Sequence, residues 1–73
     1  MTTETAFTLR GEIITLDALL KVTGLAASGG EAKVRIVAGD VRVNGEVERR
    51  RGRKIRAGDL VELSPSRVRV HAA

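Results

Sequence analysis

Residues 28–45, SGGEAKVRIVAGDVRVNG, constrain the fold more than any other part of the chain, because they carry consecutive helix and hairpin signals. Ser28 and Glu31 have the spacing of a capping box, in which the hydroxyl accepts a hydrogen bond from the backbone N–H of the acid. Ala32 and Ile36 then recur at the spacing of one helical face. The pattern predicts a capped, half-buried helix at the start of this run.

The same run ends in a tight hairpin. Gly39 can end the helix because glycine readily adopts a positive φ. Val41 and Val43 then alternate with polar residues up to Asn44-Gly45, the strongest short-range signal for a two-residue hairpin turn. We therefore expect the helix to lead directly into two short antiparallel strands.

A second helix is predicted earlier in the chain. Leu16, Leu19 and Leu20 follow the spacing of a half-buried helix. Thr15 is placed to be its N-cap, and Gly24 stops it. Because the connection to the next helix is short, we expect the two helices to lie side by side.

Alternating apolar residues predict further short strands, at Phe7 and Leu9, at Leu60, Val61 and Leu63, and at Val68 and Val70. Leu25, in the connection between the helices, is expected to be buried between them. This order predicts an α+β fold, with two adjacent helices packed on a small, mostly antiparallel sheet of short strands. We expect a single domain over residues 6–71, and disorder in residues 1–5.

Positive charge is concentrated in residues 49–56, RRRGRKIR, called the basic loop below. It holds six of the thirteen basic residues and no acid. Six like charges without counter-ions repel one another, a cost that a negatively charged partner would offset. A concentrated patch of this kind is the electrostatic footprint of a polyanion-binding protein. We expect Ile55 to anchor the loop to the core, and Arg51 and Arg53 to face solvent beside Gly52.

The spacing of apolar, glycine and turn residues is shared with a known family. The residues that carry the likeness are Leu16-Asp17, Leu20, Gly24-Leu25, Ser28, Ala32, Ile36, Gly39, Val41, Val43-Asn44-Gly45 and Gly58-Asp59. This order, over about residues 14–63, resembles the RNA-binding domain of small-subunit ribosomal protein S-four, also called the αL motif. The resemblance implies a small stand-alone bacterial RNA-binding protein whose partner is structured RNA, such as ribosomal or transfer RNA. In that family the second helix begins with Ser-Arg, whereas here Gly29-Gly30 follows Ser28.

The candidate RNA-binding residues fall into two groups. At the start of the second helix, Ser28, Gly29 and Gly30 can leave backbone N–H groups open to a phosphate, and Lys33 lies one turn further on. The second group comprises the cations of the basic loop: Arg49, Arg50, Arg51, Arg53, Lys54 and Arg56. Trp and Tyr are absent, so we expect recognition through phosphates and shape, with weak sequence specificity.

Other functions find little support in the sequence. The single histidine, His71, lies near the C-terminus without a candidate partner, and cysteine is absent, so we expect no enzyme, no metal site and no other cofactor. No apolar run approaches the ~20 residues that span a bilayer, and we expect a cytoplasmic monomer. Two alternatives to RNA remain open: non-specific binding of duplex DNA, and an adaptor whose basic loop docks on an acidic protein surface.

Overall fold

The computed structural model describes residues 3–73, and both helices lie where the sequence predicts them. In chain order the elements are β1 (Thr3–Leu9), β2 (Ile14–Thr15), α1 (Leu16–Val22), α2 (Gly29–Val37), β3 (Val41–Val43), β4 (Glu46–Val47), β5 (Lys54–Ile55), β6 (Leu60–Leu63) and β7 (Ser66–Ala72).

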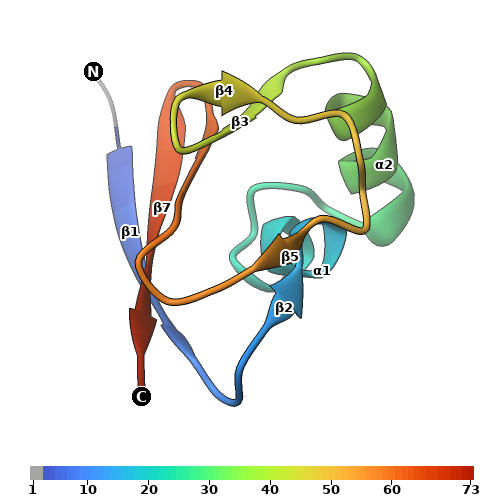
Figure 1. Ribbon diagram of the computed structural model, residues 1–73. Coiled ribbons are helices and arrows are strands. Elements are labelled where there is room, and N and C mark those ends of the chain that lie inside the picture. The colour runs from blue at the N-terminus through green and yellow to red at the C-terminus, as the bar shows by residue number, and fades with distance from the viewer. Residues whose placement is uncertain (1–2) are drawn as a thin grey trace.

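The strands form a mixed main sheet and a small second sheet. The main sheet has the order β1-β7-β6-β3-β4, in which β1 is parallel to β7 and every other pair is antiparallel. A separate antiparallel pair joins β2 to β5. Figure 1 shows β1 and β7 side by side at one margin of the molecule, with both helices toward the opposite margin. The predicted α+β class, with two adjacent helices on a mostly antiparallel sheet, is confirmed.

One core lies between the helices and the main sheet. Helix α1 buries Leu16, Leu19 and Leu20, and α2 buries Ala32 and Ile36. The sheet contributes residues that alternate along its strands, namely Val41, Val43, Val61, Leu63, Val68 and Val70. Fully burying a side chain of this kind contributes about 1.5–3 kcal/mol, so these residues dominate the favourable free energy of folding. In the helix connection Ala26 is buried and Leu25 only partly buried, which corrects the expectation that Leu25 is the buried residue.

The first strand is longer than the sequence predicts. Residues 3–5, expected to be disordered, belong to β1, which pairs with β7 from Thr3↔Ser66 to Leu9↔Ala72. An ion pair of 2.9 Å between Glu4 Oε1 and Arg67 Nε adds a contact between the side chains of these strands. The polar start of the chain is therefore ordered by pairing with a distant segment. Residues 1–2 lie outside the described residues.

The predicted hairpin turn is confirmed, and it has a second role. Asn44 and Gly45 have φ of 52° and 85°, the two positive values of a type I′ turn between β3 and β4. The Asn44 side chain also donates to Asp59 Oδ1 (3.0 Å) and accepts from Leu60 N–H (2.9 Å). The turn therefore ties the hairpin to the start of β6.

Within residues 3–73, neither helix has the length and apolar character needed to cross a membrane.

Candidate nucleic-acid interface

The basic loop is held against the fold along its backbone. It contains β5, which pairs with β2, and Ile55 is fully buried as predicted. The carbonyl oxygens of Arg51 and Arg53 accept hydrogen bonds from the N–H groups of Asp17 (3.1 Å) and Leu16 (2.9 Å). These donors belong to the first turn of α1, where backbone N–H groups have no partner within the helix. The loop therefore caps α1, and its backbone is fixed although its side chains are charged.

This arrangement refines the prediction for Thr15. Thr15 occupies the N-cap position of α1, but within the described residues its side chain makes no capping hydrogen bond. The backbone carbonyl oxygen of Arg51, in the loop, accepts a hydrogen bond from Asp17 N–H. The Asp17 carboxylate accepts a hydrogen bond from Ala18 N–H (2.8 Å). The two donors that an N-cap side chain usually serves are thus already bonded.

A buried carboxylate lies directly before the loop and corrects the expectation that its cations lack a counter-ion. Glu48 Oε2 accepts from the backbone N–H and Nε of Arg50, both at 3.1 Å. Glu48 Oε1 accepts from Arg50 Nη2 (3.1 Å) and Arg53 Nη1 (2.7 Å). These hydrogen bonds lower the pKa of Glu48 from its usual 4.5 to about 2. Glu48 was not among the predicted site residues because it precedes the basic run, although an acid two residues before Arg50 was a readable signal.

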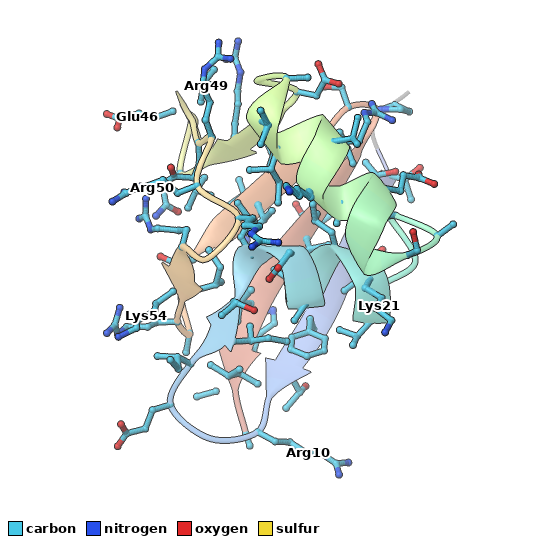
Figure 2. The ribbon with its side chains drawn as sticks, turned by 90° about the vertical axis from the view of Figure 1, so that its right-hand side faces the viewer. Arg10, Lys21, Glu46, Arg49, Arg50 and Lys54 are labelled. Atoms are coloured by element: carbon cyan, nitrogen blue, oxygen red, sulfur yellow. The ribbon has the colours of Figure 1, made fainter. Side chains whose placement is uncertain are left out.

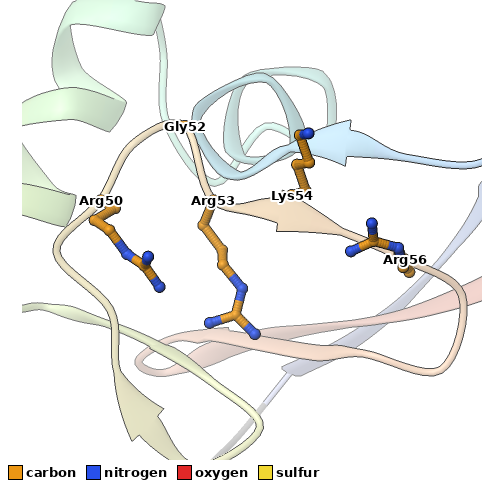
Figure 3. A pocket seen from close by; sticks show the side chains of 5 residues that line it. All are labelled: Arg50, Gly52, Arg53, Lys54 and Arg56. Carbon is orange, nitrogen blue, oxygen red and sulfur yellow. The ribbon is translucent and has the colours of Figure 1, made fainter.

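Four cations line a shallow hollow of about 450 Å³ on this loop. The lining residues are Arg50, Gly52, Arg53, Lys54 and Arg56. In Figure 3 the side chains of Arg50 and Arg53 extend to the same side of the loop, whereas Lys54 extends from the other side. Two carboxylates bond to these residues: Glu48 to Arg50 and Arg53, and Asp59 to the backbone N–H of Arg56. The four cations outnumber them, so the hollow stays positive. It is suited to bind an anion.

Exposure separates the loop arginines from one another. The side chains of Arg50 and Arg53 are 77% and 35% exposed, while that of Glu48 is 9% exposed. Arg51 faces solvent as predicted. Arg53 is only partly exposed, because its guanidinium donates to Glu48, so the prediction for this residue is confirmed only in part.

Arg49 has a different role from the other loop cations. Its Nη1 donates to the carbonyl oxygen of Val37 (3.1 Å), the last residue of α2. The guanidinium lies over Gly39, where an added Cβ would come within 2.8 Å of Arg49 Nη2. A cation at a helix C-terminus is favoured by the helix dipole. Arg49 therefore joins the loop to α2, and Figure 2 shows Arg49, Arg50 and Lys54 along one edge of the molecule.

The other candidate group lies at the opposite end of α2. Ser28 Oγ accepts from Glu31 N–H (3.1 Å), which confirms the hydroxyl half of the predicted capping box. Helix α2 has nine residues, which places this end about 13 Å from the Arg49 end at 1.5 Å per residue. Ser28, Gly29 and Gly30 are not among the residues that line the hollow of the basic loop.

Neither glycine of this corner is required by the fold. Neither has a positive φ, and an added Cβ at Gly29 would meet no described heavy atom within 4 Å. At Gly30 it would meet only Ser28 Oγ, at 3.8 Å. The helix start is bare backbone open to solvent. Lys33 is exposed and also borders an apolar hollow formed with Val34, Val37 and Ala38.

Among residues 3–73, no group of three or more histidine, cysteine, aspartate or glutamate side chains is arranged to hold a metal ion.

A small α+β domain with six of its thirteen basic residues on one fixed loop has the charge distribution of a nucleic-acid-binding domain. The family model of the S4 domain matches residues 7–71, so the chain belongs to the S4 domain family. This confirms the resemblance drawn from the helix and hairpin spacing.

Two curated relatives share much of the chain. One, from Bacillus subtilis (strain 168), is named "Probable ribosome maturation protein RlbA". It is 46% identical over 52 residues, which is 71% of this chain and 73% of that protein. The other, from Escherichia coli (strain K12), is named "Putative RNA-binding protein YbcJ". It is 44% identical over 54 residues, which is 74% of this chain and 77% of that protein.

Proposed function

We propose that this chain is an RNA-binding module that recognises structured RNA, ribosomal or transfer RNA, through phosphate contacts and shape. The observation that carries the proposal is the cationic hollow on a loop whose backbone is bonded to α1 and β2. Membership of the S4 domain family and the names of the relatives support RNA as the partner and a non-enzymatic role. The proposed unit is a cytoplasmic monomer with one RNA-binding domain over residues 6–71.

The hollow has hydrogen-bond donors left for phosphates. A guanidinium carries five N–H donors and a lysine ammonium carries three. Arg50 uses Nε and Nη2 on Glu48, and Arg53 uses Nη1, so each keeps further donors for a ligand. Hydrogen bonds between such cations and phosphate oxygens are among the strongest in proteins. The Lys54 and Arg56 side chains, both exposed, add charge at the same hollow.

The start of α2 supplies a second contact in this proposal. Helix N-termini attract anions because their free N–H groups and the helix dipole point outward. Gly29 and Gly30 leave that backbone uncovered although packing does not require glycine there. Because these glycines do not line the hollow, a ligand that touches both the corner and the hollow must be larger than one phosphate group. That requirement favours a polynucleotide over a single phosphate.

Specificity is expected to come from shape. The chain has one aromatic residue, Phe7, which is half-buried and packs against the core. Reading unstacked bases normally needs exposed aromatic rings. A folded RNA that presents phosphates in a fixed arrangement is therefore the proposed ligand, rather than an unstructured single strand.

The proposal is tested by comparing three ligands at equal salt: bulk transfer RNA, poly(U) and duplex DNA. Tightest binding is expected for transfer RNA, measured by fluorescence anisotropy. Equal or tighter binding of duplex DNA would instead identify a general DNA-binding protein. A partner that survives nuclease treatment during copurification, with no affinity for any of the three ligands, would identify a protein adaptor.

A further inference from the structure

We propose that Glu48 is a positioning residue for RNA binding, because its buried carboxylate holds Arg50 and Arg53 in the orientation in which they meet phosphates. The inference rests on the proposed RNA-binding function and extends it to Glu48, whose negative charge has the same sign as the charge of RNA. An acid inside a polyanion site ordinarily weakens binding by repulsion. The geometry at Glu48 points to the opposite effect.

The carboxylate lies beneath the two arginines. Both Glu48 oxygens bond to Arg50, through Nε and Nη2, in the paired arrangement that fixes a guanidinium plane as well as its position. The Arg50 backbone N–H also donates to Glu48, so the same carboxylate fixes the loop at the residue that carries the side chain. Arg53 Nη1 donates to Glu48 Oε1 at 2.7 Å, the same oxygen that accepts from Arg50 Nη2. With Glu48 buried and Arg50 largely exposed, the free donors of Arg50 point outward.

Holding the Arg50 and Arg53 side chains in place before RNA binds raises the affinity for RNA. A free arginine samples many rotamers, and a ligand that binds it must offset the lost conformational entropy. Glu48 imposes that loss on Arg50 and Arg53 in the free protein, before any RNA binds. The negative charge of Glu48 repels RNA, but the positive charges of Arg50 and Arg53 together exceed it. Pre-ordering two long side chains corresponds to about fivefold or more in affinity.

The alternative account, in which Glu48 only neutralises the arginines, predicts the opposite sign. Glu48→Gln has nearly the same shape, removes the charge and replaces one acceptor by a donor. If Glu48 positions the arginines, this variant binds RNA more weakly although the protein has become more positive. If Glu48 only neutralises them, the variant binds more tightly.

Glu46→Gln is the matched control. Glu46 lies two residues earlier, on β4, is exposed, and takes part in none of the ion pairs found within residues 3–73. With bulk transfer RNA as the probe, we expect Glu46→Gln to bind as well as the wild type or slightly more tightly. We expect Glu48→Gln to bind about fivefold more weakly. Glu48→Gln binding equal to or tighter than wild type would overturn the proposal.

A coupling measurement separates positioning from general structural support. In a background of Arg50→Ala with Arg53→Ala, Glu48→Gln should cause no further loss, because the residues through which it acts are gone. A loss as large as in the wild-type background would overturn the proposal. If circular dichroism shows that Glu48→Gln does not fold, Glu48→Asp replaces it. Glu48→Asp keeps the negative charge but shortens the side chain by one methylene, so it should also bind RNA more weakly. RNA binding by Glu48→Asp as tight as that of the wild type would overturn the proposal.

The proposed function and the positioning role fail in different ways. A wild-type protein without affinity for either transfer RNA or ribosomal RNA refutes both. A wild-type protein that binds, together with a Glu48→Gln variant that binds equally well, refutes positioning alone.

Discussion

The contact between Glu48 and its two arginines makes part of the folding free energy depend on pH. The pKa of Glu48 is lowered to about 2 by the hydrogen bonds from Arg50 and Arg53. A carboxylate whose pKa is lower in the folded than in the unfolded state favours folding above its unfolded pKa of about 4.5. This contribution is present at neutral pH and is lost progressively as the pH falls from about 4.5 to about 2.

We therefore predict that replacing Glu48 changes the acid sensitivity of the fold. Glu48→Gln should lower the free energy of unfolding at pH 7, and the gap to wild type should narrow between about pH 4.5 and pH 2. Urea denaturation at a series of pH values measures this. Glu46→Gln is the control, because Glu46 forms none of the ion pairs found within residues 3–73. The difference in free energy of unfolding between Glu46→Gln and wild type should not narrow over this pH range. A Glu48→Gln gap that stays constant down to pH 2 would mean that the ion pairs do not form in solution.

The corner at the start of α2 gives a second prediction at this scale. Gly29→Glu should weaken RNA binding strongly, because it places a negative charge where a phosphate is proposed to bind. Its melting temperature should be unchanged or slightly raised, since an acid in the first turn stabilises a helix by about 0.3–1 kcal/mol. Gly29→Ala is the matched control for bulk and should bind nearly as well as wild type. Normal RNA binding by Gly29→Glu, or loss of its fold, would each count against this contact.

Lys33 extends the same contact. Lys33→Ala should weaken binding by about 1 kcal/mol or more, the range for a hydrogen bond to a charged group. The fold should be kept, because the side chain is exposed. The two quantities to compare are the dissociation constant for transfer RNA and the melting temperature. An unchanged dissociation constant would restrict the interface to the basic loop.

At the scale of the elements, the Asn44-Gly45 turn sets the register of β3 and β4. Gly45 has φ of 85° and open space around its Cα. Gly45→Val should therefore destabilise the fold through backbone strain alone, by about 1–2 kcal/mol. Gly52→Val is the control, because Gly52 has equally open space without a positive φ. Thermal unfolding should show a clear loss for Gly45→Val and little for Gly52→Val; equal melting temperatures would contradict the assigned turn.

Local signals were enough to predict the elements that form within a short stretch of chain. The Ser28 cap, the leucine spacing of α1 and the Asn44-Gly45 turn each depend on residues a few positions apart, and each is confirmed. Pairings between distant segments left no such signal. The parallel alignment of β1 with β7 joins the two ends of the chain, and the β2–β5 pair joins segments about forty residues apart. Neither could be read from alternation alone.

At the scale of the whole molecule, the fold is a rigid support for its charged edge. The basic loop is bonded to α1 through its carbonyls, to β2 through β5, and to α2 through Arg49. The sequence predicted which cations gather on this edge, because they are consecutive. It did not show that Arg53 bonds to Glu48 and is only partly exposed, because such contacts depend on the packing of the surrounding elements. The residues at the start of α2, predicted from the sequence as a second group, do not line the hollow of the basic loop.

If RNA is held by phosphate contacts from the basic loop, the affinity for transfer RNA must depend steeply on salt. The logarithm of the affinity should fall with the logarithm of salt concentration with a slope of about 3 to 5, from roughly 0.7–0.9 per phosphate contacted. Arg51→Ala with Lys54→Ala removes two exposed loop cations that form none of the ion pairs found within residues 3–73. This pair should reduce the slope by about 2 and keep the fold.

The control removes the same charge elsewhere: Arg42→Ala with Arg69→Ala, exposed residues of β3 and β7. Its slope should stay close to that of the wild type. An affinity that hardly changes between low and physiological salt, or a slope reduced equally by both double variants, would contradict binding through the basic loop.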